Sequence, residues 1–345
     1  MKKYYSAAFL LVISMFLCNS ALAVDLSWSV APNAVSQTAI SMEVAAEAQA
    51  VEYRFVFVSS PTGGTGGISS DWQSSRSYTD DSLSINHQYG YYAEARDANG
   101  VTIGTSPTVN RYTLTKEPAG VAFPYPSSSS TYIYAMYNAV AGNLDGLLSR
   151  GGSGYIIYCK ETGTNSGWRV SNGQTAFTGL LGSRRYTFTS KLRNGDGIET
   201  AESAECYGYT KAYNPGAQPL SNIWTDSITA NWSANNNSAG TEYLCENTTT
   251  GVNSGWITET SWICGGLQFD TKYTFRVKAR NGGGVETAYV SLGSATTLDL
   301  GKASNPSPSF GDVLAWQDGV TLGWTVGEDI QSSNVYFGTD SYKIA

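Results

Sequence analysis

Charged residues are scarce in this sequence, making up 14% of 345 residues against about 25% in an average soluble domain. Histidine is scarcer still, because His87 is the only one. A multi-histidine zinc site is therefore excluded, and His87 is the one histidine that could act as a base. The formal net charge of −7 leaves no basic surplus to displace counterions from a phosphate backbone. Nucleic acid is not an expected partner.

The motifs of common enzyme classes are also missing: the sequence has no GxSxG, Walker loop, CxxC or HExxH. Two acidic pairs, Asp80 with Asp81 and Glu202 with Glu205, could be read as the two carboxyls of a glycoside hydrolase. Nothing places either pair across a cleft, and neighbours on a strand point to opposite faces. We expect solvated loop acids, no catalytic, metal or cofactor-binding residues, no cofactor, and no enzymatic activity in this sequence.

Long hydrophobic runs are absent except at the start of the chain. Lys2 and Lys3 precede an apolar run at 7–17, and the segment closes on Ala-Leu-Ala at 21–23. This pattern predicts a cleaved secretory signal peptide over 1–23, with an uncleaved anchor as the alternative. The run is shorter than the roughly 20 residues of a membrane span, so we expect no transmembrane segment after cleavage. The protein is expected to be secreted or displayed at the cell surface.

Turn-forming and aromatic residues are abundant, with 37 Gly, 23 Tyr and 9 Trp, and they recur in an ordered pattern. A tyrosine follows a leucine by six residues three times over, in Leu83 with Tyr89, Leu180 with Tyr186, and Leu267 with Tyr273. Seven residues after each tyrosine an arginine opens a polar, glycine-bearing turn, at Arg96, Arg193 and Arg280. Repetition at this spacing predicts tandem domains, and the alternation between tyrosine and arginine predicts a strand with one buried face.

Other elements precede each repeat in the same order. Four segments with strand alternation align without gaps: Ile40–Val44, Ile133–Tyr137, Ile228–Trp232 and Val320–Trp324. Strand-like runs beginning at Tyr53, Tyr155 and Tyr243 come next, followed by Trp72, Trp168 and Trp256. Each unit is therefore expected to be an all-β domain of the same topology.

These units resemble fibronectin type III domains, an immunoglobulin-like family of seven-strand β-sandwiches. The resemblance implies a tyrosine corner at Tyr89, Tyr186 and Tyr273, where a buried hydroxyl bonds to the backbone of a turn. It places His87 in the surface turn of the first corner. The tryptophan that the family carries on strand B is matched by Trp232 and Trp324, but Val44 and Tyr137 take its place in the first two units.

Proline-rich and small polar stretches mark the boundaries between units. We predict a signal peptide at 1–23, fibronectin type III-like domains at 24–115, 116–210 and 211–298, and an incomplete β-sandwich module at 299–345. The last segment lacks the strands of a corner and a final hairpin, so the sequence is expected to be truncated at its C-terminal end. Short linkers containing proline predict a semi-extended rod.

Four cysteines remain after the predicted leader, and an even number in an exported protein suggests two disulfides. Cys245 and Cys264 align with Ile157 and Phe177, which the resemblance assigns to inward positions on strands C and E of opposite sheets. A cross-sheet disulfide is therefore expected, with buried free thiols as the alternative. Cys159 and Cys206 are left for a second bond, although strand F separates their strands in the resembled family.

The sequence does not identify a ligand. Trp168 and Trp256 either cover a sheet edge or stack on a sugar, as exposed aromatics do in carbohydrate-binding modules. The leading hypothesis is a non-catalytic secreted or cell-surface protein whose repeats act as spacer, adhesion and protein-interaction modules, with proteins or surface glycans as partners. The alternative is an accessory arm of a secreted hydrolase whose catalytic domain lies beyond residue 345.

Overall fold

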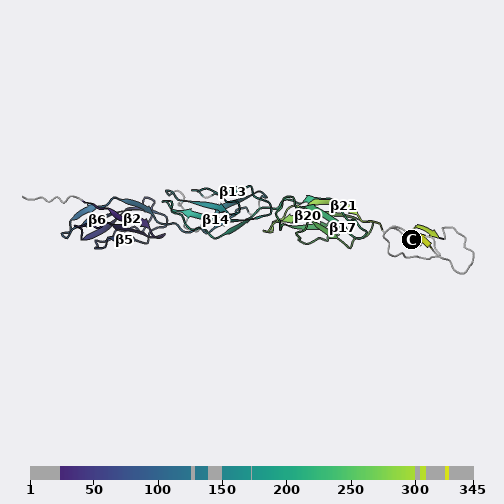
Figure 1. Cartoon of the computed structure of the whole chain (residues 1–345), viewed down its shortest axis with the longest axis horizontal. Coiled ribbons are helices and arrows are strands. Elements are labelled where there is room, and N and C mark those ends of the chain that lie inside the picture. The colour runs from purple at the N-terminus through teal and green to yellow at the C-terminus, as the bar shows by residue number, and fades with distance from the viewer. Residues whose placement is uncertain are drawn as a thin grey trace, which may run out of the picture.

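The computed structural model describes residues 24–125, 129–138, 150–171, 173–299, 304–307 and 323–325. The described chain contains strands, turns and irregular segments, which fold into three β-sandwiches that follow one another in a line (Figure 1). The predicted all-β, immunoglobulin-like class is confirmed. Over these same residues, no helix has the length and apolar character to span a membrane. The predicted leader at 1–23 lies outside the described residues.

The first sandwich consists of two sheets. Its strands are β1 (Val24–Asp25), β2 (Trp28–Ala34), β3 (Ile40–Val44), β4 (Glu52–Ser59), β5 (Ser77–Asp80), β6 (Gln88–Arg96), β7 (Thr102–Thr105) and β8 (Val109–Tyr112). One sheet has the order β2-β3-β5, and the other has the order β1-β7-β6-β4 with β8 also pairing β6. All neighbours are antiparallel except β1 and β7.

The second and third sandwiches repeat this plan with fewer strands. The second has β9 (Val121–Ala122), β10 (Tyr132–Tyr137), β11 (Gly154–Cys159), β12 (Thr164–Asn165), β13 (Thr175–Thr178), β14 (Arg185–Arg193) and β15 (Cys206–Tyr209). The third has β16 (Gly216–Ala217), β17 (Ile228–Ser233), β18 (Glu242–Asn247), β19 (Ser261–Cys264), β20 (Lys272–Arg280) and β21 (Val290–Thr296). Their sheets have the orders β13-β10-β9 with β12-β11-β14-β15, and β16-β17-β19 with β18-β20-β21.

Each sandwich buries its own hydrophobic core between its two sheets. The position two residues after each corner tyrosine is fully buried, as Tyr91, Phe188 and Phe275. Burial of one such side chain stabilises a fold by about 1.5–3 kcal/mol. The three cores draw on residues 26–103, 121–192 and 212–292, while the domain limits themselves stay predictions.

The last residue of the aligned segments 40–44, 133–137 and 228–232 is buried in all three sandwiches, although the residue type differs. Val44, Tyr137 and Trp232 are at most 3% exposed. In the tail, β22 (Ser304–Ser307) pairs with β23 (Gly323–Thr325), where Trp324 is 37% exposed. The remainder of the predicted incomplete module lies outside the described residues.

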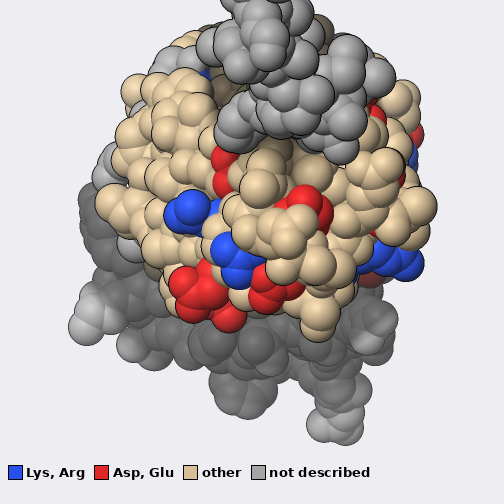
Figure 2. Space-filling view, turned by 90° about the vertical axis from the view of Figure 1, so that its left-hand side faces the viewer, with Lys and Arg blue, Asp and Glu red and all other residues tan. Residues whose placement is uncertain are grey.

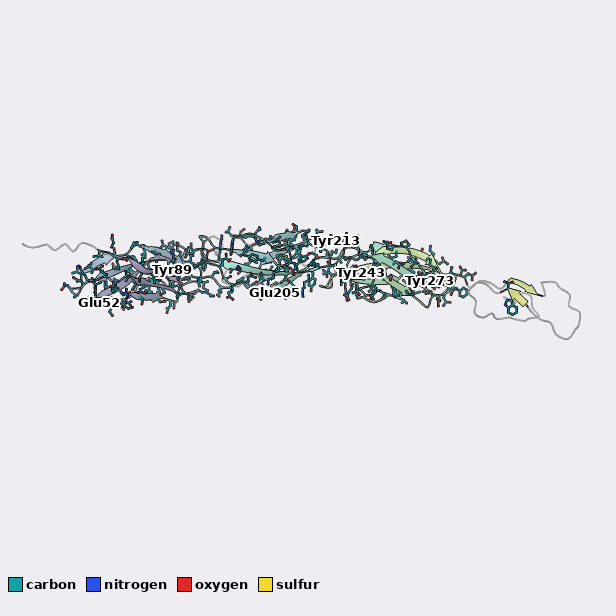
Figure 3. All side chains as sticks on the ribbon, in the orientation of Figure 1. Glu52, Tyr89, Glu205, Tyr213, Tyr243 and Tyr273 are labelled. Atoms are coloured by element: carbon teal, nitrogen blue, oxygen red, sulfur yellow. The ribbon has the colours of Figure 1, made fainter. Side chains whose placement is uncertain are left out.

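The repeated tyrosines lie inside the sandwiches with their hydroxyls turned to a loop; Tyr89 and Tyr273 are labelled in Figure 3. Each hydroxyl accepts a hydrogen bond from the backbone amide that follows the paired leucine, at 2.7 Å for Tyr89, 2.7 Å for Tyr186 and 2.8 Å for Tyr273. Leu83, Leu180 and Leu267 are at most 8% exposed. The loop residue three positions after each leucine has a positive φ, at Asn86, Ser183 and Asp270, which gives the corner its sharp bend.

Removal of a corner hydroxyl should destabilise its own domain. For Tyr186→Phe and Tyr273→Phe we expect a loss of about 1–3 kcal/mol, because a partly buried backbone amide is left without its acceptor. Urea unfolding of the full chain, followed domain by domain through hydrogen exchange, measures the loss. Tyr207→Phe is the matched control, since its side chain is 46% exposed. Unchanged stability in both corner variants would contradict a structural role for these hydroxyls.

Candidate functional site

Each domain stacks an arginine on a tryptophan at the end of its longest strand. The distances from guanidinium carbon to ring centroid are 4.5 Å for Arg96 on Trp72, 4.4 Å for Arg193 on Trp168 and 4.3 Å for Arg280 on Trp256. These are the repeated arginines and tryptophans of the sequence, which spacing alone did not join. A cation over an indole at an exposed site contributes about 0.5–1 kcal/mol. One face of each ring is covered, so a sugar would have to stack on the opposite face.

A glutamate completes the stack in two of the three domains. Glu52 and Glu242 each accept a 2.6 Å hydrogen bond from the Nε of the first and third arginine. The bond from Arg280 holds the pKa of Glu242 below its ordinary value. Gly154 pairs with Arg193 at the equivalent position, and the Nε of Arg193 is buried without a hydrogen-bond partner. An unpaired buried donor costs about 1–3 kcal/mol, so the second stack is the weakest.

The third domain extends its stack along β20. The Nζ of Lys278 lies 5.5 Å from the centroid of the Trp256 ring and 4.8 Å from that of Tyr289. The guanidinium of Arg276 lies 3.9 Å from the Tyr289 ring and pairs with Glu246 at 2.9 Å. Aromatic rings and basic side chains therefore alternate along this face of the third domain, and acidic partners neutralise the basic side chains. The end of the molecule that the first domain forms likewise shows acidic beside basic side chains (Figure 2).

The prediction of solvated loop acids is wrong for Asp80. Its side chain is fully buried at the end of β5, and Oδ2 accepts hydrogen bonds from the Tyr91 hydroxyl at 2.7 Å and the Ile68 amide at 2.9 Å. Oδ1 has no partner, and burial raises the pKa of this carboxyl. Asp81 is exposed, so the two acids diverge as strand neighbours do.

The remaining candidates for acid or base chemistry lie apart from one another. Glu205 is exposed and pairs with Lys160 at 2.7 Å, whereas Glu202 accepts a hydrogen bond from Thr189. His87 is half-buried, and burial, followed by the charge of a nearby arginine, lowers its pKa. Within the described part of the chain, no three or more His, Cys, Asp or Glu side chains form a group that could hold a metal ion.

The disulfide predictions do not hold in this structure, where Cys159, Cys206, Cys245 and Cys264 are all free thiols. For the first pair geometry forbids a bond: Cys159 and Cys206 are the partners of Phe188 on its two sides in the sheet. Two strand spacings of about 4.8 Å separate them, beyond the roughly 7 Å that a disulfide allows between Cα atoms. Cys245 and Cys264 do lie in one core on opposite sheets, yet they are unbonded.

The first and second domains meet through buried polar groups that sequence reasoning missed. The Nδ2 of Asn194 lies 3.2 Å from the carbonyl oxygen of Thr113 and 3.4 Å from that of Tyr112. The Oδ2 of Asp196 accepts a hydrogen bond from the Tyr112 amide at 2.8 Å. The turn after β14 therefore contacts the last strand of the preceding sandwich.

Asn86, in the corner loop of the first domain, adds a second set of contacts at this joint. It is fully buried, and its Oδ1 accepts a hydrogen bond from the Gly195 amide at 3.0 Å. Its Nδ2 donates to the hydroxyl of Ser153 at 3.1 Å. A cleft of about 500 Å³ opens beside the joint between residues 36–38, 114–115, 117 and 198–201, so residues of both domains form its walls.

The joint between the second and third domains repeats part of this arrangement. The Nδ2 of Asn281 donates to the carbonyl oxygen of Thr210 at 2.8 Å. Within the third domain, Asn237 bonds the backbone of Tyr213 twice, accepting from its amide at 2.7 Å and donating to its carbonyl at 2.9 Å. The Tyr213 ring, labelled between the two domains in Figure 3, packs where a Cβ on Gly182 would lie.

Comparisons with known proteins find similarity to parts of this chain. The fibronectin type III domain model matches residues 214–291. Chitinase A1 of Niallia circulans is 30% identical over 188 residues, which cover 52% of this chain and 25% of that protein. This chain thus spans a quarter of that curated relative. The crystal structure of the chicken CNTN1 FN1–FN3 domains aligns with 80% of this chain and 99% of its own, at 16% identity and a TM-score of 0.28.

Thiol labelling should distinguish the four cysteines. Cys206 is half-buried, whereas the other three are at most 2% exposed, and burial raises the pKa of Cys245 to about 12. Because the thiolate is the reactive form, a maleimide at pH 8 should modify Cys206 first and the others only after unfolding. Mass spectrometry of the native full chain measures the order. Fast labelling of Cys245, or a disulfide between Cys245 and Cys264, would contradict the structure.

Proposed function

Since this chain is built of tandem fibronectin type III-like sandwiches, we propose that it is a non-catalytic extracellular arm that holds its domains apart and presents their surfaces to a partner. The observation that supports this function is the end-to-end line of three sandwiches (Figure 1), with direct hydrogen bonds across both joints. Domains connected by linkers alone move freely by default, whereas buried bonds at a joint restrict that motion. The leader predicted at 1–23 supports export.

The arm proposal requires a defined distance between neighbouring domains. Spin labels carried by a keto amino acid leave the native thiols intact, and Ser59, Thr164 and Val252 are exposed sites in the first, second and third domain. We expect a single narrow distance distribution for the pairs Ser59/Thr164 and Thr164/Val252 in the full chain. Val252 with Ser294, both in the third domain, gives the width of a rigid unit. Broad distributions across both joints would contradict an arm of fixed length.

A second candidate is the carbohydrate-binding accessory arm of a polysaccharide hydrolase. The similarity to a protein named Chitinase A1 favours it, and Trp168 and Trp256 are only half-buried, so part of each ring is accessible. Partly exposed aromatic rings supply an apolar surface on which a sugar ring packs. This role concerns the same chain and does not require a catalytic residue in it.

Sedimentation with insoluble chitin tests this second candidate. If the stacks bind the polysaccharide, the full chain should co-sediment, and Trp168→Ala with Trp256→Ala should lower the bound fraction about ten-fold, the loss of roughly 1.4 kcal/mol. Val170→Ala is the matched control, because this exposed side chain lies two residues from Trp168 and leaves the indole in place. Failure of the unmodified chain to sediment would remove the carbohydrate-binding role and leave the spacer role standing.

A further inference from the structure

The turn that follows the longest strand has the same internal geometry in all three domains. At its first position the Oδ1 of Asp97, Asn194 or Asn281 accepts hydrogen bonds from the amides two and four residues later. The paired distances are 2.9 and 2.9 Å for Asp97, 3.1 and 2.8 Å for Asn194, and 3.1 and 2.9 Å for Asn281. Aspartate and asparagine thus serve equally well to shape the turn.

The other side-chain atom of this residue differs in its partner. In the second and third domains the Nδ2 of Asn194 and Asn281 donates to carbonyl oxygens of the preceding domain, at Thr113 and Thr210. In the first domain the Oδ2 of Asp97 instead accepts a hydrogen bond at 3.3 Å from the side-chain Nδ2 of Asn99, which lies within the same turn. A carboxylate cannot donate to a carbonyl oxygen, and it repels one.

The second position of the turn follows the same division. Gly195 and Gly282 lie against the rings of Tyr112 and Tyr209 from the preceding domain, and a Cβ at either glycine would overlap the ring. The first domain has Ala98 at this position. The first turn therefore lacks both features that the other two turns use at their joints.

The opposite half of the joint is a Tyr-Thr pair at the end of the last strand. The hydroxyls of Thr113 and Thr210 donate to the corner loop of their own domain, at 2.8 Å to Ser84 and 2.6 Å to Leu181. Both threonines are fully buried. This bond fixes the strand end, and with it the direction of the carbonyl that the next domain binds.

We infer that the Asn-Gly turn is a docking surface for the Tyr-Thr strand end of another sandwich domain, and that Asp97-Ala98 makes the first domain unable to dock in this way. The partner of the surface is the final strand of a preceding domain, and the pairing has one direction along the chain. This inference rests on the proposed arm function, to which it adds the residues that set the joint and the order of the domains.

Asn194→Asp separates the two roles of the asparagine. Asp97 shows that aspartate supports the turn, so the second domain should keep its thermal unfolding temperature. The joint should loosen, and the Ser59/Thr164 distance distribution in the full chain should broaden about two-fold or more, because freely moving domains are the default. The Thr164/Val252 distribution, across the second joint, should stay unchanged.

Asp97→Asn is the matched control, since it makes the same exchange in a domain with no preceding sandwich among the described residues, and it should alter neither distribution. Gly195→Ala provides an independent variant that should also broaden only the first distribution. If Asn194→Asp lowers the unfolding temperature of the second domain, Gly195→Ala decides the outcome. The inference is overturned if the Ser59/Thr164 distance distribution, in the variant that decides the outcome, stays as narrow as in the unmodified chain. Broad distributions already present in the unmodified chain would instead overturn the arm function.

Discussion

A tyrosine hydroxyl buried in a sandwich must find a hydrogen-bond partner, and the corner loop supplies one in each domain. This bond holds the loop against the sheet. The residue whose amide donates to the tyrosine, Ser84 or Leu181, also accepts at its carbonyl a hydrogen bond from the hydroxyl of Thr113 or Thr210 at the strand end. The carbonyl of that threonine accepts the asparagine of the next domain. A chain of hydrogen bonds therefore runs from the core of one sandwich to the turn of the next, and the geometry of the arm depends on the corner.

A small number of hydrogen bonds is enough to restrict motion at each joint, because the groups that form them are buried. A hydrogen bond contributes about 0.5–1.5 kcal/mol net, but a buried group that loses its partner costs about 1–3 kcal/mol. Asn86 and Asn194 are fully buried, so opening the first joint without rehydration would leave several donors and acceptors unpaired. The arginine and tryptophan stacks lie at the end of the strand that precedes the turn.

Sequence reasoning found the elements that local alternation determines. The segment Ile40–Val44 was predicted as a strand and forms β3 with those bounds, and the tyrosines lie where the repeat implied. It missed interactions between distant segments: nothing in the spacing joined Arg193 to Trp168 or Asn194 to Thr113. Asp80 was predicted to be exposed because acidic residues usually are. In the structure it is buried, because the hydroxyl of Tyr91 and a backbone amide donate hydrogen bonds to it in the core. The cysteine count suggested disulfides, but the register that separates Cys159 from Cys206 becomes visible only with the sheet assembled.

The most direct test of this account is hydrogen exchange at two amides that donate across the first joint, those of Tyr112 and Gly195. Nuclear magnetic resonance of the isotopically labelled full chain resolves them individually. The account predicts slow exchange, comparable to that of amides in the central strands β6 and β14, because both donors are held by side chains of the neighbouring domain. Exchange as fast as that of exposed loop amides, with the central strands still protected, would show that the joint opens freely and would contradict it.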